Sequence, residues 1–294
     1  MLRVVVVAAV VVALLLAYRG SGRHAPTGGH ASPSFVGDFE SGLTPWKSSG
    51  GGAQCANYGT PSGGGGHYRG DFYLDSSNPG QGTTSGRFDL PAQSTYPLEV
   101  CDVITGPLMN TVGTDGYYGL MVLAPAGYNY PGFGDVIEGL HFVNVYSAPV
   151  NLVIRTGHLA IDLETGACTT KGCAYRNGSG CTPSSSVTCL APKDVIPTFT
   201  GGRWYEIVTH VHWASDSSGL IETWYRPKGS STWTATASYS GIPTEQWTAG
   251  TSCCASHYDD EIASYTAALS APLTIWLDNQ TTGSSFSAVA ATMP

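Results

Sequence analysis

Residues 204–213 read WYEIVTHVHW and show the strict two-residue alternation of a β-strand. One face would carry Tyr205, Ile207, Thr209, Val211 and Trp213, and the other Trp204, Glu206, Val208, His210 and His212. Such a strand buries one face and presents a mixed polar and aromatic face elsewhere. The segments SSG at 217–219 and PKG at 227–229 are turn sequences suited to antiparallel hairpins. The stretch therefore predicts a strand in an antiparallel sheet.

Short segments of the same kind recur from residue 35 onward, without an internal repeat. The other candidate strands are residues 118–124, 135–143, 150–155, 220–226, 233–239 and 273–277. Long helices are disfavoured because the 294 residues include 38 Gly and 18 Pro and only 12% are charged. The hydrophobic content of 42% is ample for a core. We expect one all-β domain over residues 35–294, with two antiparallel sheets packed as a jelly roll.

The N-terminus predicts export. Arg3 precedes an apolar run over residues 4–17, which fits a secretory h-region and is shorter than the ~20 residues needed to span a bilayer. Because no clear small-residue cleavage site follows, residues 1–19 are predicted to be a signal peptide or an N-terminal anchor. Residues 20–34 then form a Gly/Ser/Pro-rich linker, and the protein is expected to be secreted.

Eight cysteines, an even number, agree with an oxidising compartment. Half of them, Cys168, Cys173, Cys181 and Cys189, lie in one segment rich in Gly, Ser and Thr. Their spacing lacks the tight C-x-x-C pairs of structural zinc sites, so disulfides that staple a loop are favoured over zinc. The remaining four, Cys55, Cys101, Cys253 and Cys254, should form further bridges, with the connectivity left open.

Several functional classes can be set aside. A net charge of −8 with only 13 Lys and Arg argues against nucleic acid or an anionic membrane as a general partner. The chain has no G-x-S-x-G elbow, no phosphate-binding loop and no E-x-D-x-x-E run of a β-sandwich glycosidase. With these classes set aside, acid–base catalysis by His, Tyr and Arg side chains is the remaining possibility. Elimination across a uronic acid needs a base at C5, an acid for the leaving C4 oxygen and donors that neutralise the carboxylate.

Six segments, taken in order, resemble bacterial polysaccharide lyases of the heparin lyase I-like family. They are residues 37–42 (GDFESG), 115–122 (DGYYGLMV), 136–142 (VIEGLHF), 202–213 (GRWYEIVTHVHW), 219–226 (GLIETWYR) and 273–279 (LTIWLDN). The resemblance implies a concanavalin A-like jelly roll whose concave face holds a uronate-containing chain.

The resemblance also implies catalytic residues. The family's histidine falls on His141, as base or carboxylate neutraliser, and its tyrosine on Tyr265, as acid or as both acid and base. The chain has Gly139 where relatives often carry Gln, and Thr266 where they tend to have Arg. A neutralising group must therefore come from elsewhere, and we assign it to Arg226. Other candidates are Arg155, Arg87 and Asn144, each of which is also explained as a solvent-facing strand residue.

Substrate binding is predicted from aromatic side chains, whose planes stack on sugar rings. The candidates are Trp204, Trp224 and Tyr225, with Trp233 and Trp247 as further aromatic residues and Arg155, Asn144 and His212 as polar contacts. At least half of the aromatic residues should instead be core. His210 and His212 share a strand face in metal-ligand geometry, but no third ligand is evident.

Catalysis of this kind requires no cofactor. Asp38, Glu40 and Asp278 could bind a structural calcium that ties the two ends of the domain, because carboxylate oxygens suit that ion. The alternative for these residues is turn and capping duty.

The sequence thus predicts a secreted, monomeric lyase that depolymerises an acidic polysaccharide, with a preference for a uronan less charged than heparin. The alternative is a non-catalytic, lectin-like jelly roll that binds carbohydrate. His141 and Tyr265 on one face of a sheet, with an Arg or Asn nearby, would favour the lyase.

Overall fold

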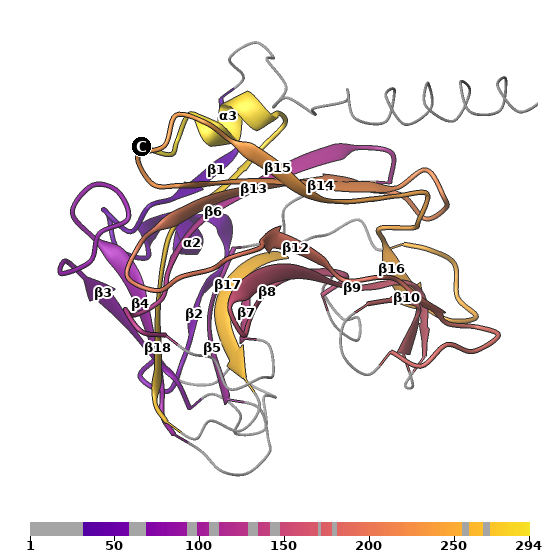
Figure 1. Cartoon of the computed structure of the whole chain (residues 1–294), viewed down its shortest axis with the longest axis horizontal. Helices are drawn as coiled ribbons and strands as arrows, with labels where there is room; N and C mark the ends of the chain where they lie inside the picture. The colour runs from indigo at the N-terminus through magenta and orange to yellow at the C-terminus, as the bar shows by residue number, and fades with distance from the viewer. Residues whose placement is uncertain are drawn as a thin grey trace, which may run out of the picture.

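The computed structural model describes residues 32–58, 69–92, 99–105, 112–128, 135–141, 148–169, 172–177, 181–254, 259–266 and 271–294. In these residues the chain forms two mostly antiparallel β-sheets packed into a sandwich (Figure 1), which confirms the predicted all-β jelly-roll class. The predicted signal or anchor segment, most of the linker and Asn144 lie outside the described residues.

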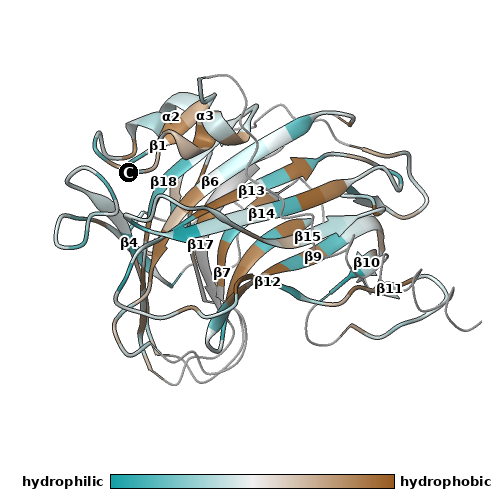
Figure 2. Ribbon diagram, turned by 45° about the horizontal axis from the view of Figure 1, so that its top comes forward, coloured by the Kyte–Doolittle hydropathy of each residue, from teal (hydrophilic) through white to brown (hydrophobic). Residues whose placement is uncertain are grey.

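One sheet has eight strands. In spatial order these are β15 (Thr234–Ser240), β14 (Leu220–Pro227), β13 (Tyr205–His212), β6 (Asp115–Leu123), β18 (Leu273–Gly283), β4 (Ser85–Leu90) and β3 (Asp71–Asp75), with β1 (Phe35–Gly37) paired to β18. The strand predicted from residues 204–213 is central to this sheet, between β14 and β6. Figure 2 shows hydrophobic and hydrophilic stretches alternating along β14 and β15.

The second sheet has ten strands. Its order is β11 (Thr188–Cys189), β10 (Gly172–Arg176), β9 (His158–Thr169), β8 (Val150–Arg155), β7 (Asp135–His141), β17 (Asp259–Thr266), β5 (Glu99–Ile104) and β2 (Gly52–Gln54), with β12 (Lys193–Ile196) and β16 (Gln246–Thr248) both paired to β9.

The main core lies between the two sheets. Leu120 and Ile207 face inward from the eight-stranded sheet, and Leu152 and Ile161 from the ten-stranded sheet. Each is at most 1% exposed. Because side chains alternate along a strand, the residues between these core positions point to the outer face of their sheet.

Two short helices complete the described fold. Helix α2 (Thr44–Ser49) buries Trp46, and helix α3 (Phe286–Ala290) covers part of the outer face of the eight-stranded sheet. The Ser285 hydroxyl caps α3 by accepting a hydrogen bond from the Ala288 amide. Among the described residues, neither helix has the length and hydropathy required to span a membrane.

All eight cysteines form disulfides, as predicted. Cys168 pairs with Cys173 and Cys181 with Cys189, both within the segment that was assigned to local bridges. The remaining pairs are Cys55 with Cys101 and Cys253 with Cys254. These bridges agree with an oxidising compartment.

Candidate functional site

The outer side of β8, β9 and β10 forms a polar face. Residues Leu152, Ile161 and Leu163 point into the core, and the alternating positions carry polar side chains. We define the polar face by Asn151, Arg155, Asp162, Glu164 and Arg176, all of which are half-buried. Strand register supports this grouping, since Asn151 pairs with Asp162 and Arg176 pairs with Glu164.

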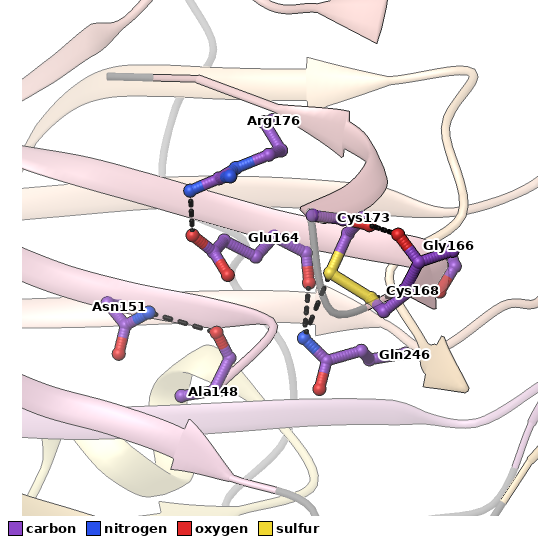
Figure 3. Close-up of a disulfide and its surroundings, with 10 residues drawn as sticks. Ala148, Asn151, Glu164, Gly166, Cys168, Cys173, Arg176 and Gln246 are labelled. Atoms are coloured by element: carbon purple, nitrogen blue, oxygen red, sulfur yellow. Dashed lines mark hydrogen bonds and ion pairs between the residues drawn. A yellow bond between two sulfur atoms is a disulfide. The ribbon is translucent and has the colours of Figure 1, made fainter. Parts of the chain in front are cut away.

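Two arginine–carboxylate pairs lie on the polar face. Arg155 Nη2 is 3.6 Å from Asp162 Oδ2, and Arg176 Nη2 donates to Glu164 Oε1. Figure 3 shows the second pair beside the Cys168–Cys173 disulfide, which Gln246 contacts through Cys173 Sγ. Each guanidinium is thereby oriented by a carboxylate on the same face.

The Arg155–Asp162 pair has unused hydrogen-bonding capacity. In the described part of the chain, the buried atoms Arg155 Nε and Asp162 Oδ1 have no hydrogen-bond partner. Burial raises the pKa of Asp162, and the nearby Arg155 guanidinium only partly opposes this shift. Buried polar atoms are normally paired, so such a pair on an outer face is suited to a polar ligand.

Strand β7, next to β8, and strand β17, on the other side of β7, carry the predicted catalytic positions. Tyr265 is in register with Val136, which pairs with Val153 on β8. His141 pairs with Asp259, and Gly139, two residues before it, pairs with Asn151. The register thus places both positions across from outer-face residues of β8, on the same side of the sheet as the polar face. Along β7 they are separated by roughly 15 Å of backbone.

Arg226, the predicted neutralising residue, is not brought to this face. It lies on β14 in the eight-stranded sheet, where it forms an ion pair with the fully buried Glu206. Its guanidinium also lies 4.6 Å from the centre of the Trp233 ring, and its Nη2 donates to the Pro294 carbonyl at 2.9 Å. These contacts on the opposite sheet give Arg226 a structural role.

The aromatic residues predicted to stack on sugars are engaged in packing. Trp224 is 3% exposed, and its ring centroid lies 5.1 Å from that of Phe286 in α3. Trp204 packs with Met121 on the outer side of the eight-stranded sheet, and Tyr225 packs against the main core. Contacts with α3 and with neighbouring side chains thus bury the two tryptophans and half-bury Tyr225.

His212 belongs to an acid–imidazole cluster on the eight-stranded sheet. Asp115 Oδ1 lies 3.0 Å from His212 Nδ1 and 2.9 Å from His210 Nε2, and Glu222 Oε2 lies 3.3 Å from His210 Nδ1. Hydrogen bonds from the two histidines outweigh desolvation and lower the pKa of Asp115. Within the described ranges, no group of three or more potential ligands able to hold a metal ion occurs.

The three carboxylates predicted to bind calcium come from two segments that are paired in the sheet. Asp38 and Glu40 follow β1, and Asp278 lies on β18, which pairs with β1. Glu40 accepts hydrogen bonds from the Thr83 and Thr84 amides, and Asp278 accepts one from the Gln81 amide. Burial is the main cause that raises the pKa of Asp278 to about 7, and the negative charge of Asp38 acts in the same direction. Two of the carboxylates therefore already hold the loop at residues 80–84.

Sequence reasoning missed most of the polar face. Asp162, Glu164 and Arg176 were not selected, although Asp162 and Glu164 alternate with Ile161 and Leu163 in a readable strand pattern. That alternation could have identified the strand, but it does not tell which carboxylates meet an arginine.

The fold defines the class of the protein as a two-sheet, mostly antiparallel β-sandwich of the jelly-roll type. No family model matches the chain, and no curated protein matches it. Among solved structures, it is similar to an endo-β-1,4-glucuronan lyase from the fungus Trichoderma reesei. That match has a TM-score of 0.63 and 14% identity, and covers 88% of this chain and 98% of the other. A PL-14 alginate lyase from Aplysia kurodai matches with a TM-score of 0.53 and 10% identity, over 86% of this chain and 100% of the other. At these identities the similarity establishes the fold.

Proposed function

We propose that the protein is a polysaccharide lyase that cleaves a uronic-acid-containing polymer by β-elimination on the polar face. The observation that carries the proposal is the half-buried Arg155–Asp162 pair, which keeps an unpaired donor and an unpaired acceptor within the described residues. The fold shared with a glucuronan lyase and an alginate lyase supports this choice of reaction. Membership of the heparin lyase I-like family remains a prediction.

Arg155 is the cation we assign to the substrate carboxylate, in place of Arg226. A guanidinium can bind a carboxylate through two parallel hydrogen bonds, and its planar fork is here oriented by Asp162. Neutralising the carboxylate stabilises the negative charge that develops when the C5 proton leaves. Asn151, whose amide donates to the Ala148 carbonyl at 2.9 Å, supplies a further polar group on the same face.

Tyr265 is the residue we assign to both proton transfers. Its ionised phenol would take the proton from C5, and the resulting phenol would donate it to the C4 oxygen as the C4–O bond breaks and the C4–C5 double bond forms. The register supports a single acid–base residue, because His141 lies at the other end of the β7–β17 pair. We assign His141 to a neighbouring sugar unit or its carboxylate.

The test is an assay of the purified protein on polyglucuronate, alginate, polygalacturonate and heparan sulfate. Ultraviolet absorbance reports the double bond conjugated to the carboxylate of the product. We expect product from an unsulfated uronan, loss of activity in Tyr265→Phe, and unchanged activity in the control Arg203→Ala, since Arg203 lies exposed beside Tyr205. Retention of a uronan without any product would overturn the lyase and support the lectin-like alternative.

A further inference from the structure

A second surface with aromatic and charged side chains lies on the outer side of the eight-stranded sheet. Tyr73, Arg87 and Trp276 lie side by side there, on the adjacent strands β3, β4 and β18. Their neighbours Phe72, Phe88 and Ile275 point into the core, so the three side chains share the outer face. Helix α3 packs elsewhere on this sheet, against Val208 and Trp224. We call this row the aromatic row.

The Trp276 indole is oriented by a hydrogen bond that spans a strand. Its indole Nε1 donates to Asp75 Oδ2 at 2.7 Å, although Trp276 is on β18 and Asp75 on β3, with β4 between them. A strand side chain normally stands roughly perpendicular to the sheet. Because this hydrogen bond spans β4, the Trp276 and Asp75 side chains lean toward each other along the sheet surface. Trp276 also packs against Met121, Leu123 and Trp204, and it remains partly exposed.

The other members extend this platform. The Tyr73 residue is 45% exposed, and the Arg87 side chain is 41% exposed. Asp89 fixes the guanidinium by accepting from Arg87 Nε at 3.0 Å and pairing with Nη2 at 2.8 Å. Because neighbouring strands are ~4.8 Å apart, the backbone positions of Tyr73 and Trp276 on β3 and β18 are about 10 Å apart. The row therefore presents an extended surface.

Charge identifies the class of ligand. The outer positions of β3 and β4 carry three carboxylates, Asp71, Asp75 and Asp89, against one guanidinium, Arg87. Such a surface repels a polyanion but offers acceptors for hydroxyl groups beside aromatic planes. We propose that the aromatic row binds a neutral polysaccharide with flat, extended chains, such as a β-1,4-linked glucan. This site is separate from the polar face and independent of the proposed lyase activity.

The test measures binding of the full chain to microcrystalline cellulose and to soluble cellohexaose. We expect retention on cellulose that persists in high salt, because the ligand is uncharged. Tyr73→Ala should weaken cellohexaose binding roughly three- to tenfold, as expected for one aromatic contact. The matched control is Tyr58→Ala, since Tyr58 is 49% exposed and lies off the row.

Asp75 is a positioning residue for the indole and can be tested separately. Asp75→Ala should weaken binding by a similar factor, whereas Asp75→Asn keeps an acceptor for the indole and should restore it. Thermal unfolding checks that each variant is folded. Absence of wild-type binding to both glucans, or equal binding by Tyr73→Ala and Tyr58→Ala, would overturn the proposal. Arg155→Ala should remain bound to cellulose, which separates this site from the lyase.

Discussion

Arg155 and Asp162 face each other on neighbouring strands of the ten-stranded sheet, with Arg155 Nη2 3.6 Å from Asp162 Oδ2. They are not register partners, because Asn151 pairs with Asp162 and Arg155 pairs with His158. The arginine side chain must therefore extend along the strand toward the carboxylate. This places an oriented cation at the end of β8 on the polar face, in a protein whose net charge is −8.

Replacement of Arg155 should disable the proposed catalysis. Arg155→Ala is expected to lower kcat/KM on the cleaved uronan by about 10²–10³, because one group that stabilises developing charge is lost. Arg155→Lys should recover only part of this loss, since an ammonium cannot form the two parallel hydrogen bonds. Initial rates compared with those of Arg203→Ala provide the measurement. Full activity in Arg155→Ala would exclude it as the neutralising group.

Replacement of Arg226 should instead affect stability. Arg226→Met leaves the Glu206 carboxylate buried without its cation, which costs about 3 kcal/mol of unfolding free energy. The double variant Arg226→Met with Glu206→Leu should recover most of the loss, because both charges are then removed. Urea unfolding measures both, and Lys47→Met serves as the exposed control. Loss of activity without loss of stability in Arg226→Met would support the original assignment of Arg226 as the residue that neutralises the substrate carboxylate.

Asp278 should make the protein less stable as the pH rises. Burial raises its pKa from 3.8 to about 7, so between these values the folded state binds more protons than the unfolded state. The free energy of unfolding therefore falls as the pH rises from about 4 to 7, by roughly 3–4 kcal/mol for this group. Asp278→Asn should lack this component, which thermal unfolding across that pH range would reveal.

The same titration tests the predicted calcium site. Bound calcium would stabilise the ionised form of Asp278 and remove the fall in stability. If calcium chloride raises the melting temperature of the wild type but not of Asp278→Asn, the calcium prediction is supported. No difference between the two proteins in their response to calcium would count against it.

The Cys55–Cys101 disulfide should stabilise the fold more than the Cys168–Cys173 disulfide. The two bridges close segments with sequence separations of 46 and 5 residues, and all four cysteines are buried. Loop-closure entropy predicts losses of about 4 and about 2 kcal/mol when each pair is replaced by alanine. Urea unfolding without reductant measures the difference. Equal losses would show that packing around the bridges outweighs the chain entropy.

Much of the fold could be predicted from local pattern. The predicted strand at residues 150–155 coincides with β8, and residues 204–213 contain β13 with Ile207 and Val211 on the core face, as expected. Strand β9 was missed although it alternates, because its polar and small residues resemble the loop-rich segment that follows. Period-two alternation depends only on neighbouring residues, so it is readable without knowledge of the fold.

The sites depended on contacts that no local pattern contains. Arg155 and Arg226 both end a predicted strand, yet one lies on the polar face and the other pairs with buried Glu206 on the opposite sheet. Trp224 and Trp276 are both strand tryptophans, but α3 covers the first, whereas Asp75, 201 residues away in sequence, holds the second.

The sequence by itself thus determined the all-β class, the expectation of local disulfides in residues 168–189 and several strands, because composition and alternation are properties of the chain. The connectivity of the cysteines came from the structure. Only the tertiary structure decided which outer face each polar or aromatic side chain shares, and with which partner. Sheet pairing joins strands that are distant in sequence, and the same alternation is compatible with either sheet.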